Sequence, residues 1–494
     1  MQHRKTGVGR FAMLSVLAFA LALSPLARSA ELHKKLKEAE AKRVAVIKKV
    51  KPAVVAIFGS GGRGGGSGVL ITDDGYALTN FHVTAGAGNV MKCGLPDGIL
   101  YDAVLVGHDK VGDVALVKLL PKVKGKKFPF APMGNSDKVK AGDWSLAMGN
   151  PFLLATDFTP TVTFGLISGV HRYQYPSGVI LEYTDCIQID TSINPGNSGG
   201  PLFNMDGELI GINGRGSFQK RHRINSGVGY AISINQIKNF LGHLRAGLDV
   251  DHASVGAFVK SELNHGANPK IIIHHIIDSD AARRGLDIDD ELVSFGGRYM
   301  GSVNQFKNSL GLFPRGWRVP LTYRRDQRKK TILVRLMGVQ RREVDGGTGG
   351  GGGRPKPRPR PTPKTPASKL SIAKKGFANY YFNKFERENL LKAFTEKYGD
   401  FSKLRGEWRI RGVGTADEQQ TTLDFKVVEA EKKTEATLRT LGVSYDLQPY
   451  KLNLPQRDLT RPARSGGLIT ALFHYRHFLT QGEKGFEGGF THGG

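Results

Sequence analysis

The hydrophobic and polar positions divide the chain into stretches of different periodicity. Residues 31–50 are rich in Lys, Glu and Ala and contain no Gly or Pro, which predicts a helix that ends at Pro52. Short apolar runs then alternate with Gly, Asp and Asn turns, which predicts many short strands. These runs are 54–58, 68–72, 76–78, 103–106, 114–119, 145–148, 161–168, 179–190, 208–213 and 227–234. The spacing indicates a barrel or sandwich over residues 51–245, closed by a helix at 235–244.

A second series of strand-like and helix-like segments predicts a separate α+β domain at residues 253–340. Its strands are expected at 257–260, 271–277, 291–295, 319–323 and 331–336, and its helices at 280–284 and 304–310.

Residues 345–369 separate this domain from the last part of the chain. The segment is Gly-rich at first, which makes it flexible, and then Pro-rich and basic, which makes it extended and stiff. Residues 370–494 are predicted to form a separate α+β unit, with a helix at 377–398 and strands at 407–412, 422–428 and 434–440. His474 and His477 lie three positions apart there, a spacing that suits a metal but is more typical of a core.

The N-terminus, residues 1–29, has the pattern of a signal peptide. Basic residues come first, 13 mostly apolar residues run from Phe11 to Leu23, and small residues lead to cleavage near Ser29 or Ala30. A membrane anchor is the alternative. A helix of 13 residues spans only ~20 Å of a hydrocarbon core of ~30 Å, so cleavage is favoured. We therefore expect a periplasmic or secreted protein.

The charge balance bears on the partners. The net charge is +27, which suits an anionic polymer, an anionic membrane or acidic client proteins. The sequence has no RNP aromatic pattern, no paired CxxC and no basic helix leading into heptads. Nucleic acid is therefore not expected as a partner.

The strongest chemical signal is the run from Asn194 to Leu202, NPGNSGGPL, with Ser198 at its centre. A serine hydroxyl is a weak nucleophile that needs a base and donors for the developing oxyanion. Gly196, two residues before the serine, allows the backbone to turn so that the N–H groups of Gly196 and Ser198 point together. The alternative is a Gly-rich turn without chemical meaning.

A base and its orienting carboxylate are found upstream. His82 follows the apolar stretch ALTNF, and Asp113 opens the apolar strand VALVKL. Taken singly, they could be a packed histidine and a turn aspartate. Together with Ser198 they give the order His, Asp, Ser of chymotrypsin, in which one imidazole bridges an alcohol and a buried carboxylate.

The segments around these residues resemble the HtrA/Deg family of trypsin-like proteases over roughly residues 40–340. The matching segments are GSGVLITDDGYALTNFHV, GDVALVKL, AMGNPF, GLISGV, INPGNSGGPLFN, GELIGIN and GVGYAISI. The resemblance implies a mostly β, chymotrypsin-like double barrel carrying a Ser-His-Asp triad without a cofactor or metal. It also implies an endopeptidase for unfolded or misfolded proteins that assembles as a homotrimer or larger oligomer.

The resemblance further assigns substrate contacts. Gly196 and Ser198 would form the oxyanion hole, and 151–161 and 214–226 would be activation loops beside the site. Substrate-binding residues would include Ser192, where a trypsin would carry a carboxylate, so a small-to-medium apolar P1 residue is expected. An extended substrate would pair with the edge made by Asn213, Gly214, Arg215 and Gly216.

The domain at 253–340 resembles a PDZ domain. Gly256, Ala257 and Phe258 lie where that family holds a peptide C-terminus, and DAARRGL and DDELVS match its further segments, with Asp289 in place of the usual Gly. C-terminal peptides are thus possible partners, although docking or assembly is the alternative role.

Three alternatives stay open. The chain could be an inactive protease fold that acts as a chaperone or scaffold, or a basic polymer-binding protein. Cys93 and Cys186 could form a disulfide, but in a double barrel they would lie in different barrels, so two buried free thiols are favoured.

Overall fold

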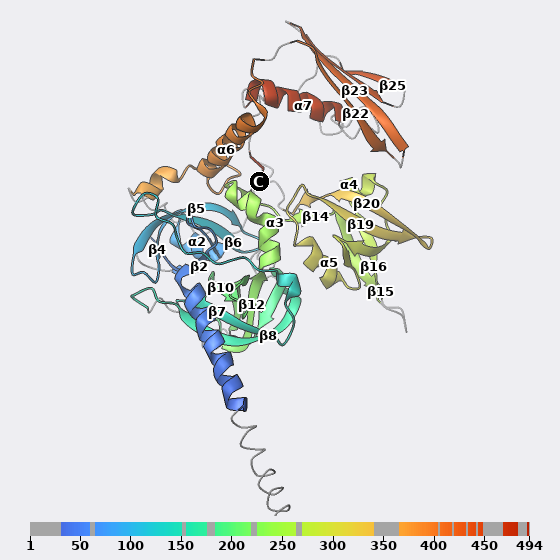
Figure 1. Cartoon of the computed structure of the whole chain (residues 1–494). Helices are drawn as coiled ribbons and strands as arrows, with labels where there is room; N and C mark the ends of the chain where they lie inside the picture. Colours follow the sequence, from blue (N-terminus) through green and yellow to red (C-terminus); the bar gives the residue numbers. More distant parts are fainter. Residues whose placement is uncertain are drawn as a thin grey trace, which may run out of the picture. The chain divides into compact units, whose positions relative to one another are not determined.

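The computed structural model describes most of the chain from residue 31 onward (Figure 1). The described residues are 31–59, 65–150, 155–174, 183–218, 225–262, 269–339, 365–403, 406–416, 419–430, 433–440, 443–447, 468–482 and 492–493. The expected signal peptide, most of the linker and parts of both expected activation loops lie outside them. In the part described, no helix is both long enough and apolar enough to cross a membrane.

A helix at 31–50, as expected, leads through a short 3-10 turn, Lys51–Ala53, into the first of two barrels. Strands β5, β4, β1, β2, β3 and β6 pair in that order, and a further β5–β6 pairing closes the ring. Their bounds are β1 Val54–Phe58, β2 Gly65–Leu70, β3 Tyr76–Thr79, β4 Val90–Gly94, β5 Leu100–Asp109 and β6 Val114–Leu119. A short helix, α2 (Phe81–Ala87), lies between β3 and β4.

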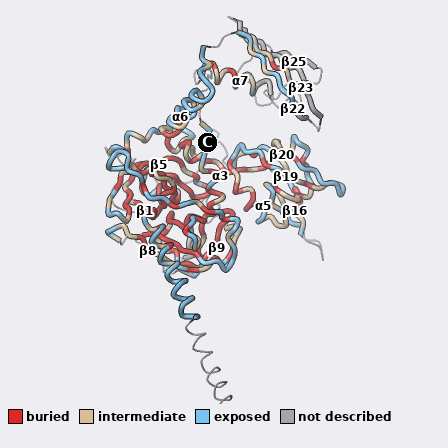
Figure 2. Tube along the Cα trace, in the orientation of Figure 1, coloured by how far each residue is buried: buried red, intermediate tan, exposed pale blue. Residues whose placement is uncertain are grey.

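The second barrel is also closed, in the order β10-β11-β12-β9-β8-β7. Its strands are β7 Trp144–Gly149, β8 Thr161–Gln174, β9 Tyr183–Ile189, β10 Pro201–Phe203, β11 Leu209–Phe218 and β12 Asn225–Ser233. Helix α3 (Ile234–Arg245) follows, and β13 (Asp249–Val250) then pairs in parallel with the end of β5. Buried side chains concentrate in the two barrels (Figure 2). These barrels confirm the predicted double-barrel fold class.

The second domain has its own core. Strands pair in the order β15-β16-β17-β19-β20, and β18 pairs with β17. The strands are β15 Ala257–Glu262, β16 Lys270–Ile276, β17 Glu291–Phe295, β18 Arg298–Tyr299, β19 Arg318–Arg325 and β20 Arg328–Arg335, with helices α4 Asp280–Arg283 and α5 Val303–Leu310. Two short strands, β14 Ala253–Ser254 and β21 Met337–Gly338, pair at its base.

Residues 365–382 pack against the first barrel. Ala367 and Phe382 belong to the same hydrophobic core as the barrel strands. The buried Asn379 donates a hydrogen bond from Nδ2 to the carbonyl of Leu105 on β5, at 2.7 Å. Backbone contacts accordingly group the chain through Phe382 into one compact unit and residues 383–493 into another.

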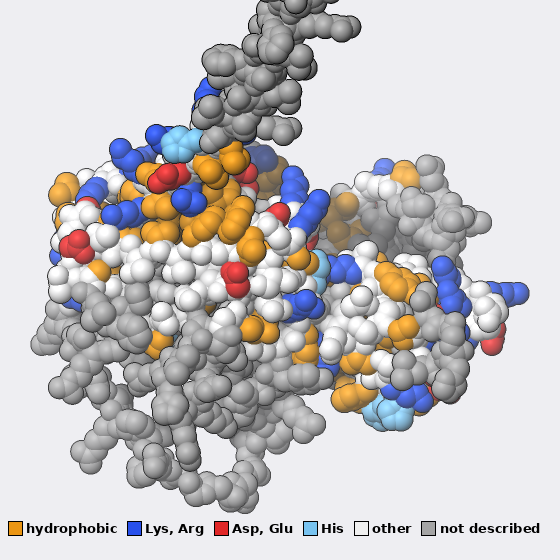
Figure 3. Space-filling model, turned by 90° about the horizontal axis from the view of Figure 1, so that it is seen from below, with side chains coloured by type: hydrophobic (Ala, Val, Ile, Leu, Met, Phe, Trp, Pro, Cys, Tyr) orange, Lys and Arg blue, Asp and Glu red, His pale blue; other side chains and the backbone are white. Residues whose placement is uncertain are grey.

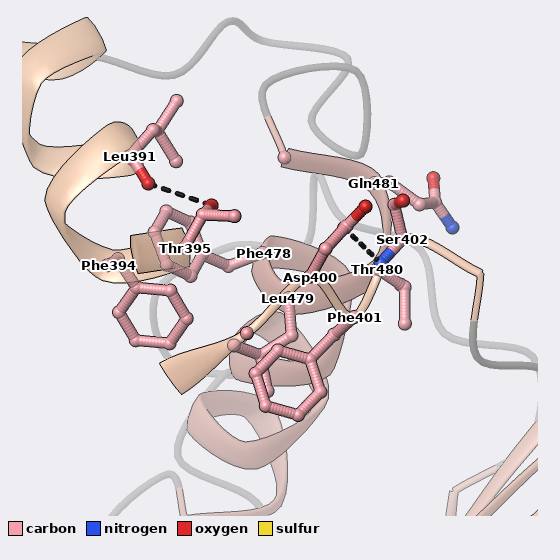
Figure 4. A pocket seen from close by; sticks show the side chains of 12 residues that line it. Leu391, Phe394, Thr395, Asp400, Phe401, Ser402, Phe478, Leu479, Thr480 and Gln481 are labelled. Atoms are coloured by element: carbon pink, nitrogen blue, oxygen red, sulfur yellow. Dashed lines mark hydrogen bonds between the residues drawn. The ribbon is translucent and has the colours of Figure 1, made fainter. Parts of the chain in front are cut away.

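The second unit contains most of α6 (Tyr380–Tyr398) and the whole of α7 (Leu468–Gln481). Its four-stranded sheet has the order β22 Trp408–Ala416, β23 Gln419–Ala430, β24 Lys433–Thr440 and β25 Val443–Leu447. A cavity of about 900 Å³ lies between α6, the turn 399–402 and the end of α7. Figure 4 shows the side chains that line it. Phe394, Phe401 and Phe478 line it together with polar residues and glycines, so its wall is mixed.

His474 and His477 lie on α7 of this unit. Burial, with the neighbouring His477, lowers the pKa of His474. Among the residues described, no three His, Cys, Asp or Glu side chains are grouped to hold a metal ion.

Candidate active site

The candidate base lies in the first turn of α2, where the apolar strand β3 ends. Asn80 is the N-cap residue, and its side chain donates to the carbonyl of Asp113, at 2.9 Å, instead of capping the helix. The imidazole of His82 is 42% exposed, so it faces solvent on one side. On the other side its Nδ1 lies 2.7 Å from Oδ2 of Asp113. Because a carboxylate only accepts, Nδ1 carries the proton and Nε2 is left free to act as a base.

The candidate carboxylate is completely buried. Asp113 has a φ of 56°, an unusual backbone conformation for a residue with a side chain, immediately before β6. Its Oδ1 accepts the backbone N–H of His82 at 2.9 Å, so it binds both the ring and the main chain of that residue. A buried charge needs such partners because desolvation otherwise disfavours it.

A third donor to this carboxylate comes from the other barrel. The hydroxyl of Tyr183, on β9, donates to Oδ2 of Asp113 at 2.5 Å. Its ring also lies beneath Gly214, where an added Cβ would come within 2.7 Å of the ring. Sequence reasoning missed Tyr183, because a tyrosine in an apolar strand cannot be distinguished from an ordinary core residue.

The candidate nucleophile lies in a tight loop before β10. The N–H of Asn197 donates to the carbonyl of Asn194, and that of Gly200 donates to the carbonyl of Asn197. Gly199 has a φ of 83°, and a Cβ there would lie 2.2 Å from the carbonyl oxygen of Ser67. Only glycine fits this position, so this part of the motif is required by close packing against the first barrel.

Ser198 is not hydrogen-bonded to His82 in the part of the chain that the structure describes. Its Oγ donates instead to the carbonyl of Gly214, at 3.2 Å. The nucleophile loop nevertheless lies close to α2, next to the neighbour of His82, Val83. A Cβ added to Gly66 would lie 2.7 Å from the side chain of Val83 and 2.8 Å from the carbonyl oxygen of Ser198. A rotation about χ1 of Ser198 is the movement that would redirect its hydroxyl.

Ser67 on β2 joins the nucleophile loop to the first barrel. Its N–H donates to the carbonyl of Ser198, at 2.9 Å, and its hydroxyl donates to the carbonyl of Gly196, at 2.6 Å. The same hydroxyl accepts the N–H of Asn150, at 2.8 Å, where the loop after β7 begins. One buried serine thus orients the peptide group that precedes Asn197. Ser67 lies in a segment that resembles the HtrA/Deg family, but no pattern in the sequence predicts this role for it.

The expected oxyanion donors are available. Within the described residues, the N–H groups of Gly196 and Ser198 donate to no protein acceptor. Gly196 has a φ of 104°, which favours glycine.

The comparisons with known proteins concern the part of the chain that carries these residues. Residues 66–212, which include all three candidate residues, match the family model described as a trypsin-like peptidase domain. The "Probable periplasmic serine endoprotease DegP-like" of Chlamydia muridarum is 36% identical over 272 residues, 52% of this chain and 50% of that protein. The "Periplasmic serine endoprotease DegP" of Escherichia coli (strain K12) is 32% identical over 309 residues, 59% of this chain and 62% of that protein. These matches support an HtrA/Deg-type serine protease domain in this chain.

The HtrA/Deg relationship covers part of the molecule. The chain spans only 50% and 62% of the length of these two relatives. Among solved structures, "HtrA-type protease AlgW with tripeptide" is 29% identical, covers 61% of this chain and 99% of that chain, and has a TM-score of 0.49.

The expected substrate residues differ in their exposure and in whether their backbone groups are already hydrogen-bonded. Ser192 is exposed, and its carbonyl accepts a long hydrogen bond from Nδ2 of Asn197, at 3.5 Å. Asn213 is buried, and its N–H and carbonyl are already bonded to Gly200 and Gly199. Strand β10 pairs with β11 only as far as Ile212. The edge of β11 left uncovered by these contacts therefore begins at Gly214, and Arg215 and Gly216 follow it.

The candidate peptide-binding residues of the second domain lie on an edge. Ala257 and Phe258 pair with β16, and β15 has no partner on its other side among the residues described. Gly256 has a φ of 75°, and Phe258 is 62% exposed. These features leave an open strand edge beside an exposed aromatic ring.

The two cysteines are free and buried, Cys93 in the first barrel and Cys186 in the second. Burial raises the pKa of both thiols, and Asp185 adds to the effect at Cys186. Such thiols are protonated and inert at neutral pH.

Proposed function

We propose that the protein is an exported serine endopeptidase that hydrolyses peptide bonds of unfolded or misfolded proteins. The observation that carries the proposal is the buried Asp113 bonded to Nδ1 of His82, beside a loop that presents Ser198. A periplasmic location is supported by the relatives, which are named periplasmic proteases, and by the basic and apolar N-terminal sequence.

The chemistry follows from the proton positions. Ser198 Oγ attacks the peptide carbonyl and gives its proton to Nε2 of His82, which then delivers it to the leaving amine. Asp113 keeps the imidazole in the required tautomer and stabilises the imidazolium. The N–H groups of Gly196 and Ser198 would receive the oxyanion, and each such donor is worth ~10²–10³ in rate. In the second half-reaction, water attacks the acyl-enzyme with His82 again acting as the base.

The substrate would be an extended apolar segment. It would pair with the open edge of β11 from Gly214 to Gly216, since an unpaired edge accepts a further strand. The absence of a carboxylate at Ser192 favours a small-to-medium apolar P1 side chain. A peptide series with Val, Ala, Lys or Asp at P1 tests this, and a higher kcat/KM for Lys than for Val would contradict it.

The active form would be a homo-oligomer, a trimer by resemblance, built through the protease domain. Trp144 and Phe164 stack with ring centroids 4.5 Å apart and remain 50% and 37% exposed. Arg43 of the N-terminal helix lies over Phe164, at 4.9 Å. Figure 3 shows hydrophobic side chains gathered beside this helix, ringed by charged ones. A second copy covering this face would bury them, and mass photometry of wild type and Trp144→Lys tests it; unchanged mass would contradict this interface.

Two measurements on the purified full-length chain test the activity. The first is cleavage of unfolded casein by wild type and by Ser198→Ala, where we expect a loss on the order of 10⁶-fold in kcat. The second is labelling by a fluorophosphonate, mapped to a residue, where we expect the adduct on Ser198. Unchanged turnover in the variant, or an adduct elsewhere, would overturn this assignment. A chain that neither cleaves nor becomes labelled would support the inactive-scaffold alternative.

A further inference from the structure

A second buried histidine–aspartate pair lies outside the candidate triad. Nε2 of His252 is 2.6 Å from Oδ2 of Asp109, and the two side chains are only 4% and 2% exposed. Because a carboxylate only accepts hydrogen bonds, Nε2 of His252 carries the proton in this contact. The proposed mechanism uses neither residue, yet burying both is costly unless they satisfy each other.

Asp109 controls the backbone that leads to the candidate carboxylate. It is the last residue of β5, and its Oδ1 accepts the N–H groups of Val111 and Gly112, at 3.1 and 2.8 Å. Asp113 follows at once in its unusual conformation. These two hydrogen bonds hold the turn that places Asp113 opposite His82.

The turn also packs directly on the pair. A Cβ added to Gly112 would lie 2.3 Å from Oδ2 of Asp109 and 3.1 Å from Nε2 of His252. A shift of the imidazole or of the carboxylate would thus move the peptide groups adjoining Asp113. The contact is tight enough to transmit displacements of a few tenths of an ångström, because packed interiors do not absorb them.

His252 is itself held from two directions. Its ring stacks on Phe240 of α3, with centroids 4.5 Å apart. Its backbone lies where the protease barrels meet the second domain: its carbonyl accepts the N–H of Val339, at 3.0 Å, and it forms an isolated bridge with Pro314. Two residues earlier, Val250 is the register partner of Asp109 itself. The second domain, through its backbone contacts, and the turn before Asp113, through the imidazole, thus both meet at His252.

We propose that His252 and Asp109 form a positioning pair that sets the place of Asp113, and that His252 ties this placement to the base of the second domain. The inference rests on the proposed function, since it concerns the same candidate triad. His252 touches neither substrate nor the triad, so it acts only through the 110–112 turn.

Four full-length variants test the proposal. His252→Leu keeps the approximate volume and removes the donor. His252→Gln keeps an N–H donor at a similar reach. Asp109→Asn leaves an amide oxygen for the loop N–H groups but places a second donor opposite His252. His171→Leu is the matched control, because His171 also pairs with a buried aspartate, Asp185, at 2.7 Å, in the other barrel.

The measurements are kcat and KM for a peptide substrate, the fluorophosphonate labelling rate at Ser198, and the thermal midpoint. Labelling to completion counts competent sites, so kcat is expressed per labelled site. We expect His252→Leu and Asp109→Asn to lose ~10–100-fold in kcat per site, with KM within about threefold, because small misplacements of catalytic groups act on this scale. His252→Gln should stay within about threefold of wild type, and the double variant His252→Leu/Asp109→Asn should be no worse than the poorer single one.

Three outcomes would overturn the inference. One is a His252→Leu enzyme with a lowered thermal midpoint but wild-type kcat per labelled site, which is what a purely structural pair predicts. Another is equal losses in His252→Gln and His252→Leu. The third is a comparable loss in His171→Leu. If His252→Leu does not fold, Asp109→Asn and His252→Gln carry the same comparison. Failure of the proposed function is distinct, because wild type itself would then neither cleave nor be labelled at Ser198.

Discussion

Each barrel contributes one half of the candidate active site, and the two halves differ in how completely their hydrogen bonds are formed. In the first barrel, His82 and Asp113 are already joined, and the carboxylate has three donors and no exposure. In the second barrel, Ser198 lies in a well-bonded loop, but its hydroxyl is turned to the carbonyl of Gly214. The imidazole of His82 is therefore already oriented by Asp113, whereas the hydroxyl of Ser198 is bonded to a backbone carbonyl instead of the base.

This difference follows from where each half finds its partners. Asp113 is bonded to residues of α2 and β9, that is, to regular elements of both barrels. The loop of Ser198 is bonded to Ser67 of the opposite barrel, whose hydroxyl also accepts the N–H of Asn150, at the start of the segment expected to be an activation loop. Substitutions in the two halves should therefore lower kcat by different amounts.

Among variants that keep Ser198, the largest effect should come from the half formed by His82 and Asp113. Asp113→Asn keeps the shape of the side chain but presents a donor or a neutral oxygen to His82, so the ring loses its required tautomer. We expect kcat to fall by ~10⁴ with little change in KM. Asp185→Asn is the control, because Asp185 is also buried and bonded to a histidine but lies outside the triad. A loss below about tenfold in Asp113→Asn, or equal losses in both variants, would contradict the assignment.

The next largest effect is expected in the half that contains Ser198. Ser67→Ala removes the hydroxyl that bonds Gly196 and Asn150 and leaves both backbone groups buried without that partner. We expect a loss of ~10–100-fold in kcat, bounded by the ~10²–10³ that one oxyanion donor is worth. Ser145→Ala is the control, since Ser145 is also fully buried and donates to a carbonyl, that of Gly165. An unchanged kcat in Ser67→Ala would show that the nucleophile loop holds its position without the first barrel.

The sequence predicted the regular parts of the fold well. Strands β1, β6 and β17 begin and end at the predicted residues, because each is an apolar run between clear turn signals. Helix α2 was missed, since FHVTAGA is short and carries β-branched and Gly residues that disfavour helices. Strand β10 has three residues, too few for a periodicity, and exists because β7 and β11 pair with it.

Some residues of the candidate site could likewise be predicted from the sequence, and others could not. His82, Asp113 and Ser198 each lie in a motif whose residue types follow from the chemistry, so a single sequence suffices to name them. Ser67 and Tyr183 act through contacts with residues 129 and 70 positions away, and no local pattern records such contacts. Only the three-dimensional pairing of the barrels brings them to the site.

The smallest expected effect is that of Tyr183, which bonds the second barrel to the carboxylate of the first. Tyr183→Phe removes one of three donors to the Asp113 carboxylate while the ring stays to fill the space beneath Gly214. One hydrogen bond contributes about 0.5–1.5 kcal/mol net, so we expect kcat to fall by roughly 2–13-fold. The measurement is kcat per labelled site, with Tyr101→Phe as control, because Tyr101 is a buried tyrosine of the first barrel that donates to Asp97. A loss as large as that of Asp113→Asn would mean that the carboxylate is held from the second barrel, and the base would then not be an independent half.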